Sequence, residues 1–219
     1  MELEFFFKKI FDSMSQTLCL SRKEGVISLI YHRVFEPEID AQMLCVSPKN
    51  FEEQMFYLQR NFEFVKVGEL QKIIKEKKIP KRAIVITFDD GYADNFNFAL
   101  PILKKLKIPA TFFVCSGNID RNEEFWNHQL EQIFFLSARL PGKLDFEFQG
   151  KQYVFHTKTQ ESIINTHNKV HEMIRVQNKE NRDKIMNLLF KWSGLVLKTR
   201  EYYRTLSSDA APLPCSDSS

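Results

Sequence analysis

The chain has 219 residues, of which 43% are apolar and 27% are charged, and its formal net charge is +3. This composition predicts a folded globular protein rather than a disordered chain. A charge of +3 is too small to indicate a nucleic-acid-binding protein, and only 7 glycines and 8 prolines argue against a turn-rich all-β fold.

The first residues, Met1-Glu2-Leu3-Glu4, are acidic where a secretory signal peptide needs positive charge. The apolar residues that follow are spaced as in an amphipathic helix, which we expect over residues 1–25. No apolar run is long enough to cross a bilayer. A cytoplasmic location is therefore the default expectation.

Four cysteines are scattered along the chain and form no C-x-x-C pair: Cys19, Cys45, Cys115 and Cys215. This spacing excludes a zinc knuckle and makes a dense disulfide framework a poor expectation. We expect scattered buried thiols.

The first half of the chain alternates strands and helices. Apolar and β-branched runs predict strands over residues 26–31, 62–67, 84–88 and 111–114. Between them, helices are predicted to begin at Pro48, near Leu70 and at Asp94, the first with Ser47 as its N-cap. Pro101 indicates a kink in the third helix, or a start at Leu100. This order predicts an α/β fold with a parallel sheet.

The pattern changes after residue 117. Helices are predicted over residues 125–136, 161–175 and 180–192. Strict alternation over 144–148, the dipeptide Gln149-Gly150 and a return at 153–155 predict a β-hairpin. Trp126 and Trp192 lie at positions typical of a helical core.

The third strand ends in Asp89 and Asp90, followed by Gly91. The carboxyl end of a strand is where chemistry is found in α/β proteins. Two adjacent buried acids are costly without a positive partner, and a divalent metal is the obvious one. The alternative is a strand end whose carboxylates only cap backbone N–H groups.

Three motifs resemble those of the polysaccharide deacetylase family, the NodB-homology carbohydrate esterases: Thr-Phe-Asp-Asp-Gly-Tyr at 87–92, Tyr-His-Arg at 31–33 and Pro-Ala-Thr-Phe-Phe-Val at 109–114. The resemblance implies a partial (β/α) barrel over residues 26–209, with residues 117–206 as an insert. It also implies an N-acetylated polysaccharide or oligosaccharide as substrate.

In this family the first aspartate of the motif is the general base and the second is a metal ligand. The resemblance thus implies these roles for Asp89 and Asp90, with zinc as the most fitting divalent metal. Gly91 would let the backbone turn sharply beneath the metal.

The family completes its metal site with two histidines at the end of a later strand. His167 and His171 have the same spacing, but their surroundings predict a helix. A helix also places such a pair on one face, where it could bind a metal, but we interpret it as a chance pair on a solvated helix. His32 could line the pocket, but we interpret it as a structural histidine, and His128 and His156 as incidental.

The resemblance stops at Ala210, and residues 210–219 have the composition of a disordered tail. We expect a frameshift or early stop after residue 209, with two metal ligands and the general acid missing. Weak metal binding and little or no turnover would follow. An unpaired sheet edge would be covered by the insert helices or by another chain, which includes self-association.

Three functions compete at this stage. The first is a metal-dependent hydrolase that removes N-acetyl groups from an amino-sugar polymer, impaired in this chain. The second is a non-catalytic remnant that binds carbohydrate or a partner. The third is a magnesium-dependent phosphoryl-transfer domain, which the position of the acids after the third strand and the lack of a Gly-rich loop disfavour.

Overall fold

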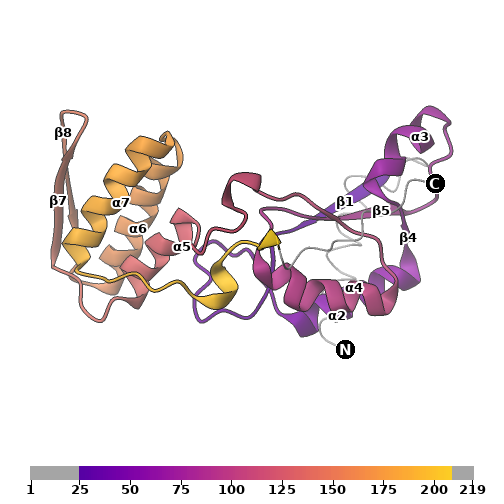
Figure 1. The fold of residues 1–219 in the computed structure, drawn as a ribbon, viewed down its shortest axis with the longest axis horizontal. Coiled ribbons are helices and arrows are strands. Elements are labelled where there is room, and N and C mark those ends of the chain that lie inside the picture. Colours follow the sequence, from indigo (N-terminus) through magenta and orange to yellow (C-terminus); the bar gives the residue numbers. More distant parts are fainter. Residues whose placement is uncertain (1–24, 209–219) are drawn as a thin grey trace. The chain divides into compact units, whose positions relative to one another are not determined.

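The computed structural model describes residues 25–208. The helix predicted before Gly25 and the tail predicted over 210–219 lie outside this range, as do Cys19 and Cys215. The chain divides into two compact units (Figure 1): unit 1 is Met1–Asp120 with Leu206–Ser219, and unit 2 is Arg121–Thr205.

Unit 1 contains a parallel sheet of four strands: β1 (Val26–Tyr31), β4 (Glu63–Phe64), β5 (Ala83–Phe88) and β6 (Thr111–Phe112). Strand β1 pairs with β5 along its whole length, whereas β4 pairs with the first two residues of β5 and β6 with the last two. The prediction of an α/β fold with a parallel sheet is confirmed. Within residues 25–208 these strands form an open sheet, and the partial barrel stays a prediction.

Two of the predicted strands are shorter than expected. Strands β4 and β6 have two residues each, against the predicted ranges 62–67 and 111–114. Each has one further backbone bond to β5, from Val65 N–H to Ile84 C=O (2.9 Å) and from Phe113 N–H to Phe88 C=O (2.7 Å). A separate parallel pair, β2 (Arg33–Val34) and β3 (Cys45–Val46), was not predicted.

Among the described helices of unit 1, α2 begins at a side-chain cap, as predicted. Helix α2 (Pro48–Asn61) begins after Ser47, whose Oγ accepts a bond from the Asn50 N–H at 3.2 Å. The other helices are the short η2 (Val67–Glu69), α3 (Leu70–Lys75), η3 (Asn95–Ala99), α4 (Leu100–Leu106) and η4 (Ser116–Asn118).

The helix predicted from Asp94 is irregular. Its first part, η3, is a π-helix, and regular α-helix begins only at Leu100. Pro101 has no N–H to bond the preceding turn and its ring crowds that turn, which accounts for the wider winding before it. The alternative start at Leu100 is confirmed.

Both faces of β5 are buried, as is usual for a central parallel strand. One face packs against α2 and α4 through a cluster that includes Phe51, Met55, Ile84, Ile86, Phe88 and Leu103. On the other face Ala83 and Val85 pack with Val65 and with the α3 residues Leu70 and Ile73. The strand that ends in the acid pair is therefore held from both sides.

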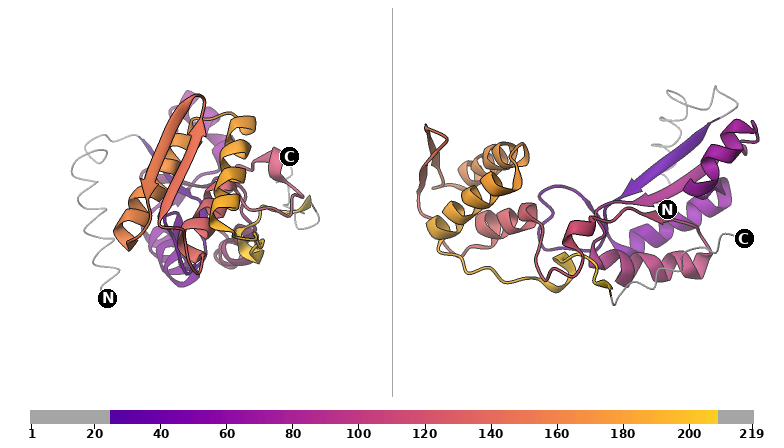
Figure 2. Two further views of the ribbon diagram at one scale, coloured as in Figure 1. Left: turned by 90° about the vertical axis from the view of Figure 1, so that its left-hand side faces the viewer. Right: turned by 45° about the horizontal axis from the view of Figure 1, so that its top comes forward.

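Unit 2 is built of a hairpin and helices, as predicted. Its elements are α5 (Trp126–Glu131), η5 (Gln132–Leu136), β7 (Lys143–Phe148), β8 (Lys151–His156), α6 (Gln160–Arg175), α7 (Lys179–Ser193) and η6 (Glu201–Tyr203). The hairpin lies beside α6 and α7 in the views of Figures 1 and 2. Its turn residues Gln149 and Gly150 have φ of 51° and 72°, as a two-residue hairpin requires.

The core of unit 2 is separate from that of unit 1. It comprises Leu130, Ile133, Phe134, Leu144, Phe146, Phe148, Val170, Ile174, Ile185, Met186 and Leu189. Trp126 and Trp192 pack against it, so their predicted core role is confirmed.

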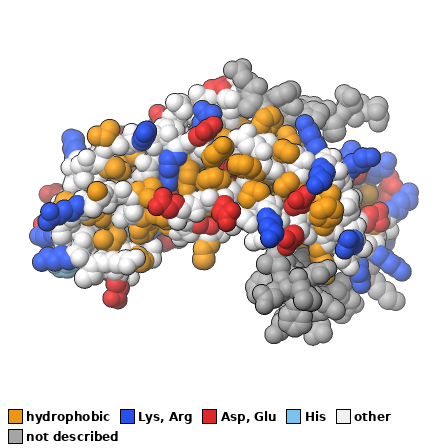
Figure 3. Space-filling view, turned by 90° about the horizontal axis from the view of Figure 1, so that it is seen from below, with side chains coloured by type: hydrophobic (Ala, Val, Ile, Leu, Met, Phe, Trp, Pro, Cys, Tyr) orange, Lys and Arg blue, Asp and Glu red, His pale blue; other side chains and the backbone are white. Residues whose placement is uncertain are grey.

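Lys and Arg side chains are interspersed with Asp and Glu on the face drawn in Figure 3. Among residues 25–208, no helix has the length and apolar character needed to span a membrane.

Candidate active site at the carboxyl end of β5

The sheet holds the acid pair in place. The Asp89 N–H donates to the Tyr31 C=O of β1 at 2.9 Å, and the Phe113 N–H donates to the Phe88 C=O from the opposite side. Both acids are half-buried. The backbone at Asp89 therefore continues the sheet, and its position is set by two neighbouring strands.

Asp90 lies in a strained turn. Its φ is +70°, and the Gly91 N–H donates to the Asp89 C=O at 2.9 Å, which closes a three-residue turn around Asp90. A non-glycine residue in such a conformation costs about 1–3 kcal/mol and persists only where surrounding contacts enforce it. Here the Cys115 N–H donates to the Asp90 C=O (3.3 Å) and the Leu206 N–H to the Gly91 C=O (2.9 Å).

Gly91 is needed for two reasons. Its φ of +74° supports the predicted sharp turn after the acids. In addition, a Cβ atom at this position would lie 2.8 Å from Val114 Cγ1 and 3.0 Å from Val114 Cβ. The Val114 side chain, at the end of the predicted strand 111–114, therefore packs directly against the turn.

A buried ion pair lies next to the turn in the sequence and in space. Arg33 Nε donates to Asp94 Oδ2 at 2.8 Å, with 1% and 0% of the two side chains exposed, and the Val34 N–H donates to Asp94 Oδ1 at 3.1 Å. The guanidinium also lies 4.7 Å from the centroid of the Tyr92 ring. Burial works against the charge of Arg33, but Asp94 outweighs it and raises the pKa of the guanidinium.

This pair connects the two motifs of the first half of the chain. Arg33 follows β1, and Asp94 lies four residues after Asp90. The sequence analysis singled out Arg33 within its motif but missed its partner, because nothing local indicates a contact between residues 61 positions apart.

Cys115 lies beside Asp90 and is exposed, so the prediction of a buried thiol is wrong at this position. Its Sγ is 3.9 Å from Asp90 Oδ1. Partial burial, followed by the charges of Asp90 and Asp89, raises the pKa of the thiol. Cys45 is half-buried, and burial raises the pKa of its thiol to about 12.

The histidine pair belongs to unit 2. His167 and His171 lie in α6, which confirms the predicted helix, but His167 is only 3% exposed and packs against the Phe134 and Phe135 rings. The interpretation of a solvated pair is therefore wrong for His167. Its spacing from Ile163 and Val170 was the missed signal, since all three share one helix face.

The remaining histidines have simple environments. His128 is buried and its Nδ1 lies 2.8 Å from Glu131 Oε2, so it makes a buried structural contact rather than being incidental. His156 is exposed on β8. His32 is half-buried and follows Tyr31, the residue that pairs with Phe88, so it lies at the same sheet edge as Asp89.

The donors present do not complete a metal centre. Carboxylates suit a divalent ion, but a catalytic zinc site takes three protein ligands. Across residues 25–208, no group of three or more His, Cys, Asp or Glu side chains is able to hold a metal ion. The acid pair therefore supplies only part of the ligand set that such a site needs.

The part of the chain that carries this geometry is similar to known proteins. The family described as polysaccharide deacetylase matches residues 76–137, a range that contains the acid pair and its turn. The poly-beta-1,6-N-acetyl-D-glucosamine N-deacetylase of Staphylococcus aureus (strain MSSA476) is 33% identical over 125 residues, which cover 51% of this chain and 42% of that protein. The chain thus spans less than half the length of the curated relatives it matches.

Two solved structures are also similar. The Streptococcus pyogenes deacetylase PplD in complex with acetate has 30% identity and a TM-score of 0.38, with 44% of each chain covered. IcaB from Ammonifex degensii has 22% identity and a TM-score of 0.43, with 84% of this chain and 88% of that chain covered. Residues 76–137 of this chain therefore match the polysaccharide deacetylase family, and the chain is similar over about half of its length to the named N-deacetylase.

Proposed function

We propose that this chain is a hydrolase of carbon–nitrogen bonds that removes N-acetyl groups from an amino-sugar polymer. The observation that carries the proposal is the strained turn that presents Asp89 and Asp90 at the carboxyl end of a buried parallel strand, inside the matched residues 76–137. Strain of this kind gathers at active sites. The printed name of the S. aureus relative supports an N-acetylated amino-sugar polymer as the substrate class.

In this proposal Asp89 is the general base. A carboxylate that is half-buried and fixed by two strands is suited to take a proton from an attacking water at a defined place. General base catalysis of this kind contributes about 10²–10⁴-fold to a rate. Neutralising Asp89 while keeping its shape should remove that factor.

Asp90 is proposed as a ligand of a divalent metal ion, with zinc as the most fitting. Its positive φ turns the chain away from the course of β5 and separates its role from that of Asp89. The described residues contain no group of three side chains that could hold a metal ion. Further ligands would therefore have to come from outside residues 25–208. We therefore expect weak metal binding and slow turnover.

The test is acetate release from an N-acetylglucosamine oligomer by the full chain with added zinc or cobalt. The expected result is a slow release that falls at least about 100-fold in Asp89→Asn. Asp183→Asn, on the exposed side of α7, is the matched control and should keep the rate of the parent chain. Equal rates in the parent chain and Asp89→Asn would contradict the proposed role.

A second candidate is a non-catalytic carbohydrate-binding module. The lack of a third metal ligand among residues 25–208 favours it. Under this function no acetate would be released, and glycan binding would be unchanged by a chelator and by Asp90→Ala. Binding that disappears in either condition would exclude it.

A further inference from the structure

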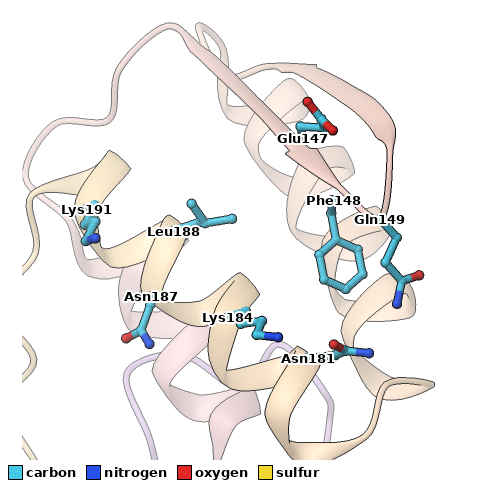
Figure 4. Close-up of a pocket in the computed structure, with 8 residues that line it drawn as sticks. All are labelled: Glu147, Phe148, Gln149, Asn181, Lys184, Asn187, Leu188 and Lys191. Carbon is cyan, nitrogen blue, oxygen red and sulfur yellow. The ribbon is translucent and has the colours of Figure 1, made fainter.

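Unit 2 has a groove between the end of its hairpin and helix α7 (Figure 4). Its volume is about 450 Å³, and it is lined by Glu147, Phe148, Gln149, Asn181, Lys184, Asn187, Leu188 and Lys191. The hairpin residues form one wall and the α7 residues the other. None of these side chains takes part in the acid-pair site, which lies in unit 1.

Regular elements form this groove, so its shape is set before any ligand binds. Along α7, Asn181, Lys184 and Leu188 follow the i, i+3, i+7 spacing of one helix face. Across from them, Phe148 is buried in the core of unit 2 and the two-residue turn fixes Gln149. Preformed walls reduce the entropy lost on binding.

Several polar groups in the groove are unused. Glu147, Gln149, Asn187 and Lys191 have no side-chain hydrogen bond or ion pair with any described residue. They surround an apolar surface made by Phe148 and by Leu188, which is 38% exposed. A few free polar groups around an apolar surface are the usual composition of a small-ligand site.

A second surface depression, in unit 1, serves as a comparison for the groove. It has a similar volume, about 450 Å³, and is lined by Gly68, Gln71, Lys72, Lys75 and Glu76. It too has an amide, two lysines and an acid, but all lie in or next to α3. No apolar side chain lines it. It offers the same charges without a second wall or an apolar surface.

The chemistry of the groove favours an uncharged sugar with an amide substituent. The carboxamides of Gln149, Asn181 and Asn187 donate and accept hydrogen bonds, as sugar hydroxyls and acetamides do. Leu188 offers a contact for an acetyl methyl or a ring face. Lys184 is paired with Glu180 at 2.7 Å, and the remaining charges of Lys191 and Glu147 balance, so a free amine gains no net attraction and loses the contacts of the acetyl group.

We propose that this groove binds an N-acetylated unit of the amino-sugar polymer and disfavours a deacetylated one. The inference rests on the proposed function for its choice of polymer. It adds a second contact with the chain of sugars, on unit 2, that distinguishes substrate from product by the acetamide group. Such a contact binds polymer that still carries N-acetyl groups and releases polymer that has lost them.

The experiment measures binding by the full chain carrying Asp89→Asn, so that no substrate is converted. N-acetylglucosamine hexamer, glucosamine hexamer and an oligogalacturonate are titrated separately by calorimetry. The expected order of affinity places the acetylated hexamer first. The double variant Asn181→Ala with Asn187→Ala should weaken its binding about tenfold, since it removes two hydrogen-bonding side chains.

The variants are chosen so that folding does not confuse the result. Alanine is a better helix former than asparagine, so the double variant should fold at least as well as its parent. Gln71→Ala with Lys75→Ala, in the α3 depression, is the matched control and should leave binding unchanged. Lys191→Glu should narrow the difference between the acetylated and free-amine hexamers.

Three results would overturn the proposal: equal affinity in the groove variant and its parent, tighter binding of the glucosamine hexamer, or tightest binding of the acidic oligomer. These outcomes are independent of the proposed hydrolysis, which the acetate assay follows through Asp89. Turnover that depends on Asp89 while binding ignores Asn181 and Asn187 would remove the groove proposal and leave the hydrolase proposal intact.

Discussion

The two units differ in how their backbones reach unusual conformations. Among the described residues of unit 1, six non-glycine residues have positive φ: Met43, Lys77, Arg82, Asp90, Lys107 and Asp120. In the described part of unit 2 the corresponding residue is Gln149, in a hairpin turn that demands it. In unit 1, Lys77 and Lys107 follow the ends of helices α3 and α4, whereas Asp90 is held by contacts from residues distant in the sequence.

The strain is informative where it coincides with chemistry. Lys107 ends α4 in the left-handed conformation common at helix ends. Asp90 has no such role: it follows a buried strand, carries a carboxylate and is held by bonds from Cys115 and Leu206. The comparison thus separates structural turns from the turn proposed to carry function. The following predictions test that separation.

The largest expected effect is loss of the buried ion pair of unit 1. Asp94→Ala would leave the Arg33 guanidinium without its buried carboxylate and should destabilise unit 1 by about 3–5 kcal/mol. Urea unfolding followed by circular dichroism measures the loss. Both tryptophans lie in unit 2, so their fluorescence reports on the other unit.

The control for this prediction is the exposed pair between Lys105 and Glu52. Lys105→Ala should change stability by no more than about 1 kcal/mol, because exposed pairs contribute little. A loss in Asp94→Ala as small as in Lys105→Ala would contradict a tight buried pair beneath the acid site.

Next in size is the contrast between Gly91 and Gly150, which have nearly the same φ in the two units. An added Cβ at Gly91 meets Val114, whereas nothing lies within 4 Å of a Cβ at Gly150. Gly150→Ala should cost about 1–2 kcal/mol for the left-handed backbone alone. Gly91→Ala should cost about 1–3 kcal/mol more, because of overpacking.

Thermal unfolding of the two glycine variants gives both values. Equal losses of stability in the two variants would mean that the Val114 side chain moves aside at little cost. Packing of Val114 against the turn around Asp90 would then not restrict position 91.

The pH dependence of unit 2 is smaller. Burial lowers the pKa of His167 from 6.5, with a smaller contribution from His171, while Asn168 and Glu131 act in the opposite direction. As pH falls below about 6.5, His167 binds a proton in the unfolded chain but stays neutral in the folded chain. The free energy of unfolding should then decrease by at most about 1.4 kcal/mol per pH unit until the lower folded pKa is passed.

Tryptophan fluorescence during urea unfolding at pH 7 and pH 5 measures this decrease. Protonated Nε2 would be a buried donor without a partner among the described residues, so His167→Gln should reduce the difference between the two pH values. His156→Gln, on the exposed side of β8, should leave it unchanged. An unaltered difference in His167→Gln would assign the effect to another group.

The smallest effect concerns a local signal of unit 2. Thr159 caps α6 in a reciprocal arrangement with Ser162. Thr159→Ala should lower stability by about 1 kcal/mol, measured by thermal unfolding, and Thr159→Ser should retain most of it. A loss several times larger would show that unit 2 depends on more than its local sequence preferences.

The sequence predicted what depends on neighbouring residues. Ser47 and Pro48 indicated the start of α2, and Gln149-Gly150 indicated the hairpin turn, because each acts on its own backbone. Asp89 and Asp90 were predicted as a candidate site from their place at the end of a buried strand and from a family motif, and the metal role stays a prediction.

What the sequence did not predict depends on distant contacts. The lengths of β4 and β6 are set by where they meet β5, and the partner of Arg33 lies 61 residues away. Cys115 is exposed because the turn at Asp90 places it at the sheet edge, which its own surroundings in the sequence do not indicate.

The proposed role of Asp90 as a metal ligand, in its strained turn, is tested by a calorimetric titration of zinc into the full chain, which does not require turnover. We expect weak binding that falls at least about tenfold in Asp90→Asn and is unchanged in Asp183→Asn. Equal zinc affinity in the parent chain and Asp90→Asn, or no binding to the parent chain, would contradict it.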